Sequence, residues 1–119
     1  MISKDLIKAN QLIYNITIKL NNSISDVWLA DMQEKFLPAC IDGLIIVSAQ
    51  INRILLEDQD EDITFAIQFT FSTIALFEKE GIHALSKFIK ALDSIYRGQY
   101  VYFTTKMEVL YYNRLPSYN

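Results

Sequence analysis

The chain holds few side chains of the kinds that carry out catalysis or bind a metal. It has one histidine, His83, and one cysteine, Cys40, far apart in the sequence. A zinc site needs about four ligands, at least three of them from the protein. Cys40 lies in the most apolar part of the chain, where a free cysteine is ordinarily a small buried side chain. The sequence therefore predicts neither a metal site nor a cysteine–histidine dyad, and it indicates no cofactor.

An acidic run near the middle of the chain could be mistaken for a calcium loop. Asp58, Asp60 and Asp62 have the alternating spacing with which an EF-hand loop opens. That loop requires glycine at its sixth position and glutamate at its twelfth, where this chain has Ile63 and Phe69. We therefore predict a solvated connection and no calcium site.

Common catalytic motifs are missing from the sequence. It contains no glycine-rich phosphate loop and no G-x-S-x-G nucleophile motif. General acid–base catalysis needs carboxylates that converge in a cleft, and most of those here fall on predicted solvated faces. Asp42 is the exception, because it lies in an apolar stretch, either on an exposed strip or paired with a cation such as Arg53. The sequence predicts a protein that is not an enzyme.

Tyrosines and basic residues gather in the C-terminal third. Residues 82–119 hold five Lys or Arg against two Asp or Glu, whereas residues 1–81 hold six against twelve. Tyrosine and arginine are enriched at protein interfaces. The predicted partner-binding residues are therefore Tyr96, Arg97, Tyr100, Tyr102, Tyr111, Tyr112 and Arg114. Aromatic rings that stack on bases, beside cations that hold phosphates, would also suit a nucleic acid; the candidates for that alternative are Lys87, Lys90, Arg97 and Lys106.

The composition is typical of one packed domain. Hydrophobic residues make up 51% of the 119 residues, with only three glycines and two prolines, which favours helices over turns or disorder. We predict a single domain over residues 1–119, with a short flexible tail from about residue 114. The N-terminal residues lack the uninterrupted apolar segment of a signal peptide, and one cysteine cannot form an internal disulfide. These features predict a cytoplasmic protein.

The apolar stretch from Phe36 to Leu56 is the element around which the other helices are expected to pack. A helix that is apolar around most of its circumference must be covered on most sides. A membrane span is disfavoured because Asp42 and Arg53 would each cost roughly 2.5–3.5 kcal/mol at the centre of a bilayer. We therefore predict a buried central helix that begins at Pro38, since proline suits a first helical turn.

Spacings of three and four between apolar residues predict further helices along the chain. The predicted helices cover residues 3–21, 25–36, 38–57, 61–80 and 82–97, with a sixth helical segment at 99–113. Gly81 and Gly98 are predicted to end the fourth and fifth helices. The preferred fold is an all-α bundle of five to six helices around the central apolar helix.

Two stretches also fit β-strands. Residues 63–71 and 100–112 can be aligned with alternating apolar and polar positions, and both are rich in residues that favour strands. Strands average five to six residues, and no glycine, proline or asparagine interrupts residues 59–80, so length favours helix there. An α+β fold with strands near 63–71 and 100–112 is the alternative.

These observations favour a small protein that acts through protein–protein binding, as a homodimer. The basis is the missing catalytic motifs, the high apolar fraction and the tyrosine-rich C-terminal third. Chaperones, toxin-neutralising partners and regulators are the functional classes that suit it. The alternative is a nucleic-acid-associated regulator that uses the basic C-terminal third.

Overall fold

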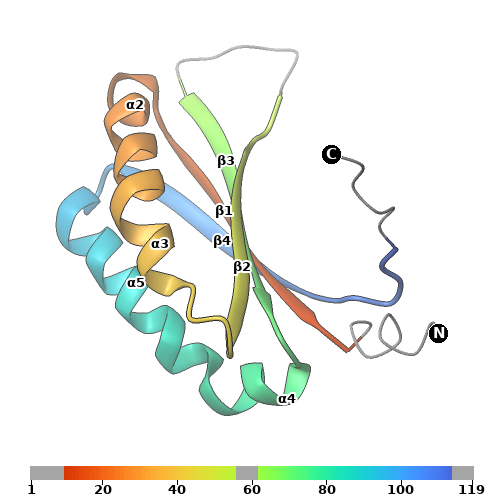
Figure 1. Cartoon of the computed structure of the whole chain (residues 1–119). Helices are drawn as coiled ribbons and strands as arrows, with labels where there is room; N and C mark the ends of the chain where they lie inside the picture. Colours follow the sequence, from red (N-terminus) through yellow and green to blue (C-terminus); the bar gives the residue numbers. More distant parts are fainter. Residues whose placement is uncertain (1–9, 56–61, 114–119) are drawn as a thin grey trace, which may run out of the picture.

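The computed structural model describes residues 10–55 and 62–113, which form a four-stranded antiparallel sheet with helices on one of its faces (Figure 1). The strands are β1 (Leu12–Asn21), β2 (Ile46–Arg53), β3 (Asp62–Phe71) and β4 (Tyr100–Glu108). They stand in the sheet in the order β2-β3-β1-β4. One helical segment follows β1 and another follows β3, so the described chain runs strand, helix, strand, strand, helix, strand.

Each helical segment is continuous but contains a π-helical turn. The first consists of α2 (Asn22–Asp31), η1 (Met32–Phe36) and α3 (Leu37–Cys40), and the second of α4 (Ile74–Leu76), η2 (Phe77–Gly81) and α5 (Ile82–Tyr96). Both begin with a side-chain cap, in which Asn21 Oδ1 accepts from Ser23 N at 2.8 Å and Thr73 Oγ1 accepts from Leu76 N at 3.0 Å. Such caps satisfy backbone N–H groups that have no partner within the helix. Within residues 10–55 and 62–113, no helix has the length and apolar character needed to cross a membrane.

The core lies between the sheet and the helices. The two central strands supply alternate side chains to it: Leu12, Ile16, Ile18 and Leu20 from β1, and Phe65, Ile67, Phe69 and Phe71 from β3. Trp28 of α2 stacks on Phe65 with ring centroids 4.8 Å apart, and Phe88 of α5 meets Phe69 edge-on at 5.3 Å. Each helical segment is therefore joined to β3 by an aromatic pair, a contact worth about 0.5–1.5 kcal/mol beyond its buried area.

The predicted all-α bundle is wrong, because the protein is α+β. The predicted helix at 3–21 contains β1 in its described part, the one at 38–57 contains the end of α3, a turn and β2, and those at 61–80 and 99–113 contain β3 and β4. The alternative had placed strands near 63–71 and 100–112, where β3 and β4 lie. The predicted helices at 25–36 and 82–97 are confirmed by α2 with η1 and by α5. Pro38 does not start a new helix, since it lies within a continuous helical segment.

A turn at Asp42 and Gly43 divides the apolar stretch that was predicted to be one central helix. Gly43 has a φ of +80°, a left-handed conformation that residues with a Cβ disfavour. Asp42 Oδ1 accepts from the backbone N–H groups of Leu44, Ile45 and Ile46 at 2.9, 2.8 and 3.1 Å. The hydrogen bonds from Leu44 and Ile45 are the main reason why the pKa of the Asp42 carboxyl lies below its usual value. Asp42 therefore shapes the turn that leads into β2.

The other two glycines differ in their places. Gly98 has a φ of +77° and ends α5, as predicted. Gly81 does not end a helix, because η2 continues into α5 through this residue. A Cβ at Gly81 would lie 2.4 Å from Cδ1 of Phe77. Gly81 is therefore required for the close approach of the Phe77 ring.

Gly81→Ala is expected to lower the free energy of unfolding. Alanine in a helix interior ordinarily gains roughly 1 kcal/mol over glycine, whereas overpacking costs about 1–3 kcal/mol. We expect overpacking to dominate because the Phe77 ring also packs edge-on against Phe71, at 4.9 Å, and cannot move freely. Urea denaturation is the measurement. Ser94→Ala, on the exposed side of α5, is the control, and equal or higher stability of Gly81→Ala would contradict this account.

Candidate functional site

The face of the sheet opposite the helices is not covered by any described element (Figure 1). We call it the open face. It is made by the alternate strand positions that do not point into the core. Its side chains are Ser48, Gln50 and Asn52 of β2, Asp62, Thr64, Ala66, Gln68 and Thr70 of β3, Ile13, Asn15, Thr17 and Lys19 of β1, and Val101, Phe103, Thr105 and Met107 of β4.

The open face is almost free of charge. Its charged side chains are Lys19 and Asp62, and these two pair with each other at one end of the sheet, where Lys19 Nζ lies 3.8 Å from Asp62 Oδ2. The remaining positions carry hydroxyl, carboxamide or apolar groups. Charged residues are depleted at the centre of protein interfaces. The composition of the open face is that of a covered surface.

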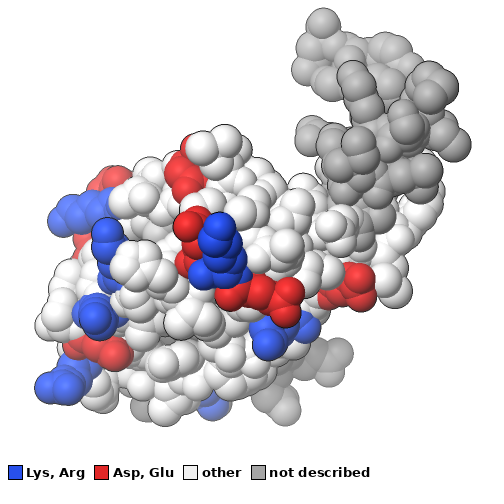
Figure 2. Space-filling model, turned by 90° about the horizontal axis from the view of Figure 1, so that it is seen from below, with Lys and Arg blue, Asp and Glu red and all other residues white. Residues whose placement is uncertain are grey.

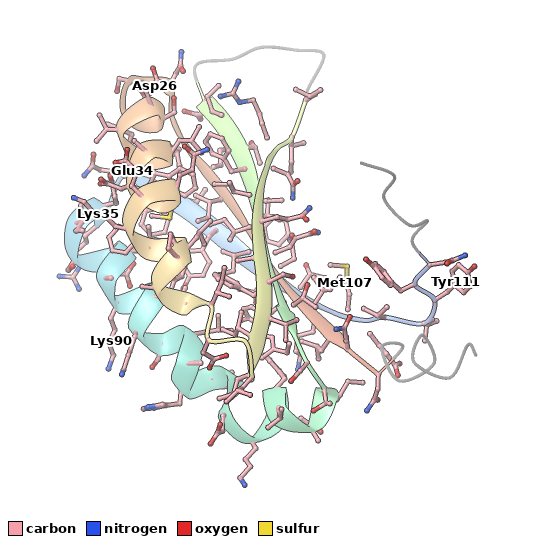
Figure 3. The ribbon with its side chains drawn as sticks, in the orientation of Figure 1. Asp26, Glu34, Lys35, Lys90, Met107 and Tyr111 are labelled. Carbon is pink, nitrogen blue, oxygen red and sulfur yellow. The ribbon has the colours of Figure 1, made fainter. Side chains whose placement is uncertain are left out.

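The helical side of the molecule has the opposite character. Figure 3 shows Asp26, Glu34, Lys35 and Lys90 projecting from the helices away from the sheet, whereas Met107 and Tyr111 lie on the other side of the sheet. Figure 2 shows acidic and basic side chains interspersed over the end of the molecule at which α4 lies. Interspersed charges of both signs are typical of a surface that stays in water.

Three carboxamides form a row across the middle of the open face. The strand register pairs Asn15 of β1 with Gln68 of β3, and Gln68 with Gln50 of β2. Asn15 is only 8% exposed, and its Nδ2 donates to Thr17 Oγ1 at 2.9 Å. Gln50 Nε2 donates to Asn52 Oδ1 at 3.1 Å. Because a carboxamide has both donors and an acceptor, this row can bind a neutral polar partner, including a second row of the same kind.

Strand β4 adds an apolar margin to the open face. Val101, Phe103 and Met107 lie on the same face of this strand and are exposed. Leu110 and Tyr111 follow in residues 109–113, which leave the sheet on the side away from the helices (Figure 1). Single exposed apolar side chains are ordinary, whereas here three of them lie on one face of one strand.

Two of the predicted partner-binding tyrosines are engaged inside the molecule. Tyr96 of α5 is buried, and its hydroxyl donates to Asp31 Oδ2 of α2 at 2.6 Å. Tyr100 is half-buried, and its hydroxyl donates to Asp93. Burial, followed by the hydrogen bond and charge of Asp93, raises the pKa of Tyr100 above its usual value. These contacts join the two helical segments to each other and α5 to β4.

Stability should fall at alkaline pH as Tyr96 loses its proton. Burial, followed by the hydrogen bond and the charge of Asp31, raises the pKa of Tyr96 from 10.0 to about 12. Because the folded-state pKa lies above the unfolded-state one, the stabilisation is complete below pH 10 and is lost as the pH rises to 12. Thermal unfolding should therefore show a wild-type advantage over Tyr96→Phe that shrinks across this interval. Parallel stability curves for the two proteins would contradict the assignment.

The other predicted partner-binding residues lie on different sides of the sheet. Tyr102 is exposed on the helical side of β4, and Arg97 is exposed just after α5. Tyr111 and Tyr112 follow β4 beside the open face. Arg114 lies outside the described residues. Among the described residues of this set, the structure therefore brings only Tyr111 and Tyr112 to the open face.

The candidate nucleic-acid residues all lie away from the open face. Lys87 and Lys90 are exposed on α5, with Arg97 at its end. Lys106 lies on the helical side of β4, with its Nζ 5.9 Å from the centroid of the Phe77 ring. The central strands β1 and β3 place no aromatic ring on the open face, where sheet-based RNA-binding domains stack bases. These cations thus lie on the opposite side of the sheet from Phe103, whereas the exposed Tyr102 lies on their side.

The histidine and the cysteine also lie in the helical layer. His83 is exposed in the first turn of α5, and Cys40 is half-buried at the end of α3. Burial raises the pKa of the Cys40 thiol, which lowers its thiolate fraction at neutral pH. Within the part of the chain that is described, no three His, Cys, Asp or Glu side chains are grouped closely enough to hold a metal ion. Asp58 and Asp60 lie outside that part.

The residues that define the open face were not predicted from the sequence. Asn15 and Gln68 were assigned to helices, and Gln50 to the central helix. The signal that could have revealed them is the alternation in β3, where Thr64, Ala66, Gln68 and Thr70 stand between aromatic and aliphatic residues without a single charge. A strand whose outer positions are uncharged over most of its length suggests a covered face.

The sequence matches a known family. The sequence model of the family described as "Domain of unknown function (DUF4286)" matches residues 11–110. The chain belongs to this family. The match spans all four strands and both helical segments of this DUF4286 domain. No protein with a curated description matches the chain in sequence.

Several solved structures share the fold. A dimeric ferredoxin-like protein from an uncultured marine organism has a TM-score of 0.66 at 11% identity, covering 87% of this chain and 98% of that one. HapK from Hahella chejuensis has a TM-score of 0.64 at 12% identity, covering 90% and 99%. A protein of unknown function from Nitrosomonas europaea has a TM-score of 0.52 at 15% identity, covering 89% and 96%. These similarities establish a ferredoxin-like α+β fold.

Proposed function

We propose that the protein acts through protein–protein contacts and forms a homodimer in which the open faces of two sheets pack against each other. The observation that carries this proposal is the open face itself, which extends over all four strands and whose described charges are one ion pair at its end. Two sheets that pack face to face lie about 10 Å apart, so their side chains interdigitate. Packing of this kind would cover the apolar margin on β4.

A second copy suits the open face because its groups are complementary to themselves. A two-fold interface brings the same surface patch of both subunits together. Carboxamides meet this requirement, since a donor in one subunit can face an acceptor in the other. Lys19 and Asp62 lie at one end and neutralise each other, so no large field of one sign opposes its copy. The dimeric state of the marine ferredoxin-like protein also supports this partner.

The proposed activity is binding and not catalysis. The described groups of the open face are hydroxyls, carboxamides and apolar side chains, with one ion pair at its end. Groups of this kind give an interface its fit and its hydrogen bonds. They are less suited to general acid–base chemistry, which needs a group that titrates near the working pH.

Sedimentation equilibrium of the full chain tests the proposal. We expect a mass of twice 13.8 kDa at micromolar concentrations. Phe103→Lys should raise the dimer dissociation constant at least about tenfold, because it places a charge in a dry interface. Val27→Lys is the matched control: Val27 on α2 is 63% exposed and Phe103 is 62% exposed, but only Phe103 lies on the open face. A wild-type mass of 13.8 kDa at all concentrations, or equal effects of the two variants, would refute the proposal.

A further inference from the structure

A groove of about 520 Å³ lies on the open face, between strands β2 and β3 and the segment that follows β4. Gln50 and Gln68 of the carboxamide row contribute to its floor, together with Thr70, and Tyr111 and Tyr112 line its other side. None of the described residues that line it is charged. Small-molecule sites commonly measure about 300–1,000 Å³ and combine apolar walls with a few placed polar groups.

We propose that this groove binds a neutral, planar small molecule that carries an amide-like donor and acceptor on one edge. The two glutamine side chains supply the matching acceptors and donors, because each carboxamide offers both. The exposed Tyr111 ring supplies a flat surface on which a planar ligand can stack. An ionised ligand is disfavoured, since no charged side chain within residues 10–55 and 62–113 lines the groove and burial of an unpaired charge is costly.

The floor of the groove is held in place by the sheet. Gln68 is half-buried on the central strand β3, directly opposite Asn15 on one side and Gln50 on the other. Gln50 is oriented by the bond from its Nε2 to Asn52 Oδ1, which engages one of its donors and leaves its carbonyl oxygen available to accept from a ligand. Polar groups positioned by a sheet need little reorganisation when a ligand binds.

The tyrosine side of the groove is anchored at one end and exposed beyond it. Val109 N donates to the carbonyl oxygen of Gln11 at 2.9 Å, which fixes the start of the segment next to β1. Tyr111 is 80% exposed and lies on the open-face side in Figure 3. A ligand or a second subunit on the open face would bury this ring. The cover over the groove rests on the proposed homodimer, whereas the floor and the tyrosine wall belong to one chain.

Benzamide and benzoate form a matched pair of probes, because they share the ring and differ in the neutral amide against the carboxylate. We would titrate each into the isotope-labelled wild-type protein and follow the side-chain amide signals of Gln50 and Gln68 by NMR. Benzamide should shift both signals saturably, and benzoate should bind at least about tenfold more weakly. Tyr111→Ala and Gln68→Leu should each weaken benzamide binding at least about threefold, since they remove a stacking surface and a hydrogen-bonding group.

Thr64→Val is the control, because Thr64 lies on the same strand and the same face but does not line the groove, and it should leave benzamide binding unchanged. Absence of a saturable shift in a protein that sediments as a dimer would overturn the ligand site and leave the proposed dimer intact. Equal binding of benzoate would overturn the preference for a neutral ligand. Equal benzamide affinity in the dissociated Phe103→Lys variant would overturn the part assigned to the second subunit.

Discussion

Thr17→Arg should convert the homodimer into monomers while the chain stays folded. Thr17 stands near the middle of the open face, between Phe103 of β4 and Ala66 of β3. An arginine there would carry its charge into the dry centre of the interface, and the two-fold symmetry would place two such charges in it. An uncompensated buried charge costs roughly 3–5 kcal/mol. The dimer dissociation constant should therefore rise by at least about a hundredfold.

The same new side chain on the helical layer provides the control. Ser94→Arg introduces arginine at an exposed position of α5 and should leave the dimer dissociation constant unchanged. Size-exclusion chromatography with light scattering measures the mass of each variant, and far-ultraviolet circular dichroism reports whether it is folded. A folded Thr17→Arg protein that remains fully dimeric would show that the open face is not the interface.

Trp28→Ala should cause the largest loss of stability among single substitutions in the helical layer, about 3–5 kcal/mol. Trp28 is fully buried and stacks on Phe65 of the central strand, so its removal leaves a cavity between α2 and β3. Urea denaturation followed by circular dichroism measures the loss. Val27→Ala changes the neighbouring exposed residue of α2 and should stay within about 0.5 kcal/mol of wild type.

A second substitution keeps an aromatic ring at position 28. The Nε1 of Trp28 is buried without a hydrogen-bond partner among the described residues. Trp28→Phe removes this unsatisfied donor and part of the ring, so it should cost clearly less than Trp28→Ala. Equal losses from the two variants would indicate that the stacking on Phe65 contributes little.

The helices that the sequence predicted correctly have polar and apolar residues well separated around the helix. In α5, Leu85, Phe88 and Leu92 are buried while Lys87 and Lys90 are exposed, which fits a period of 3.6. Local pattern and tertiary structure agree in this segment. The helix predicted at residues 82–97 is therefore confirmed.

Two different features of the sequence prevented the prediction of β1 and β2 as strands. In β1, Ile13, Ile16 and Leu20 have helical spacing, because Ile13 places an apolar side chain on the open face and obscures the alternation of the others. In β2, a shift of register between Ile46 and Ser48 interrupts the period of two. A pattern reading without knowledge of strand partners could not resolve either case.

The shortage of glycine and proline was also misleading, because this chain makes its connections with polar caps. Asn21 ends β1 and caps α2 directly, and Thr73 caps α4 two residues after β3 ends. The candidate site also could not be predicted from the sequence without the fold. Asn15, Gln50 and Gln68 are far apart in sequence and become neighbours only through the strand register.

We propose that two subunits meet through their open faces. Isotope-filtered NOE spectroscopy on a mixed dimer of labelled and unlabelled subunits tests it most directly, since it detects only contacts between subunits. We predict intersubunit NOEs from the methyl groups of Thr17, Ala66 and Met107 to protons of the partner's open face. Intersubunit NOEs confined to side chains of α2 and α5, or their absence at concentrations where the protein sediments as a dimer, would contradict the account.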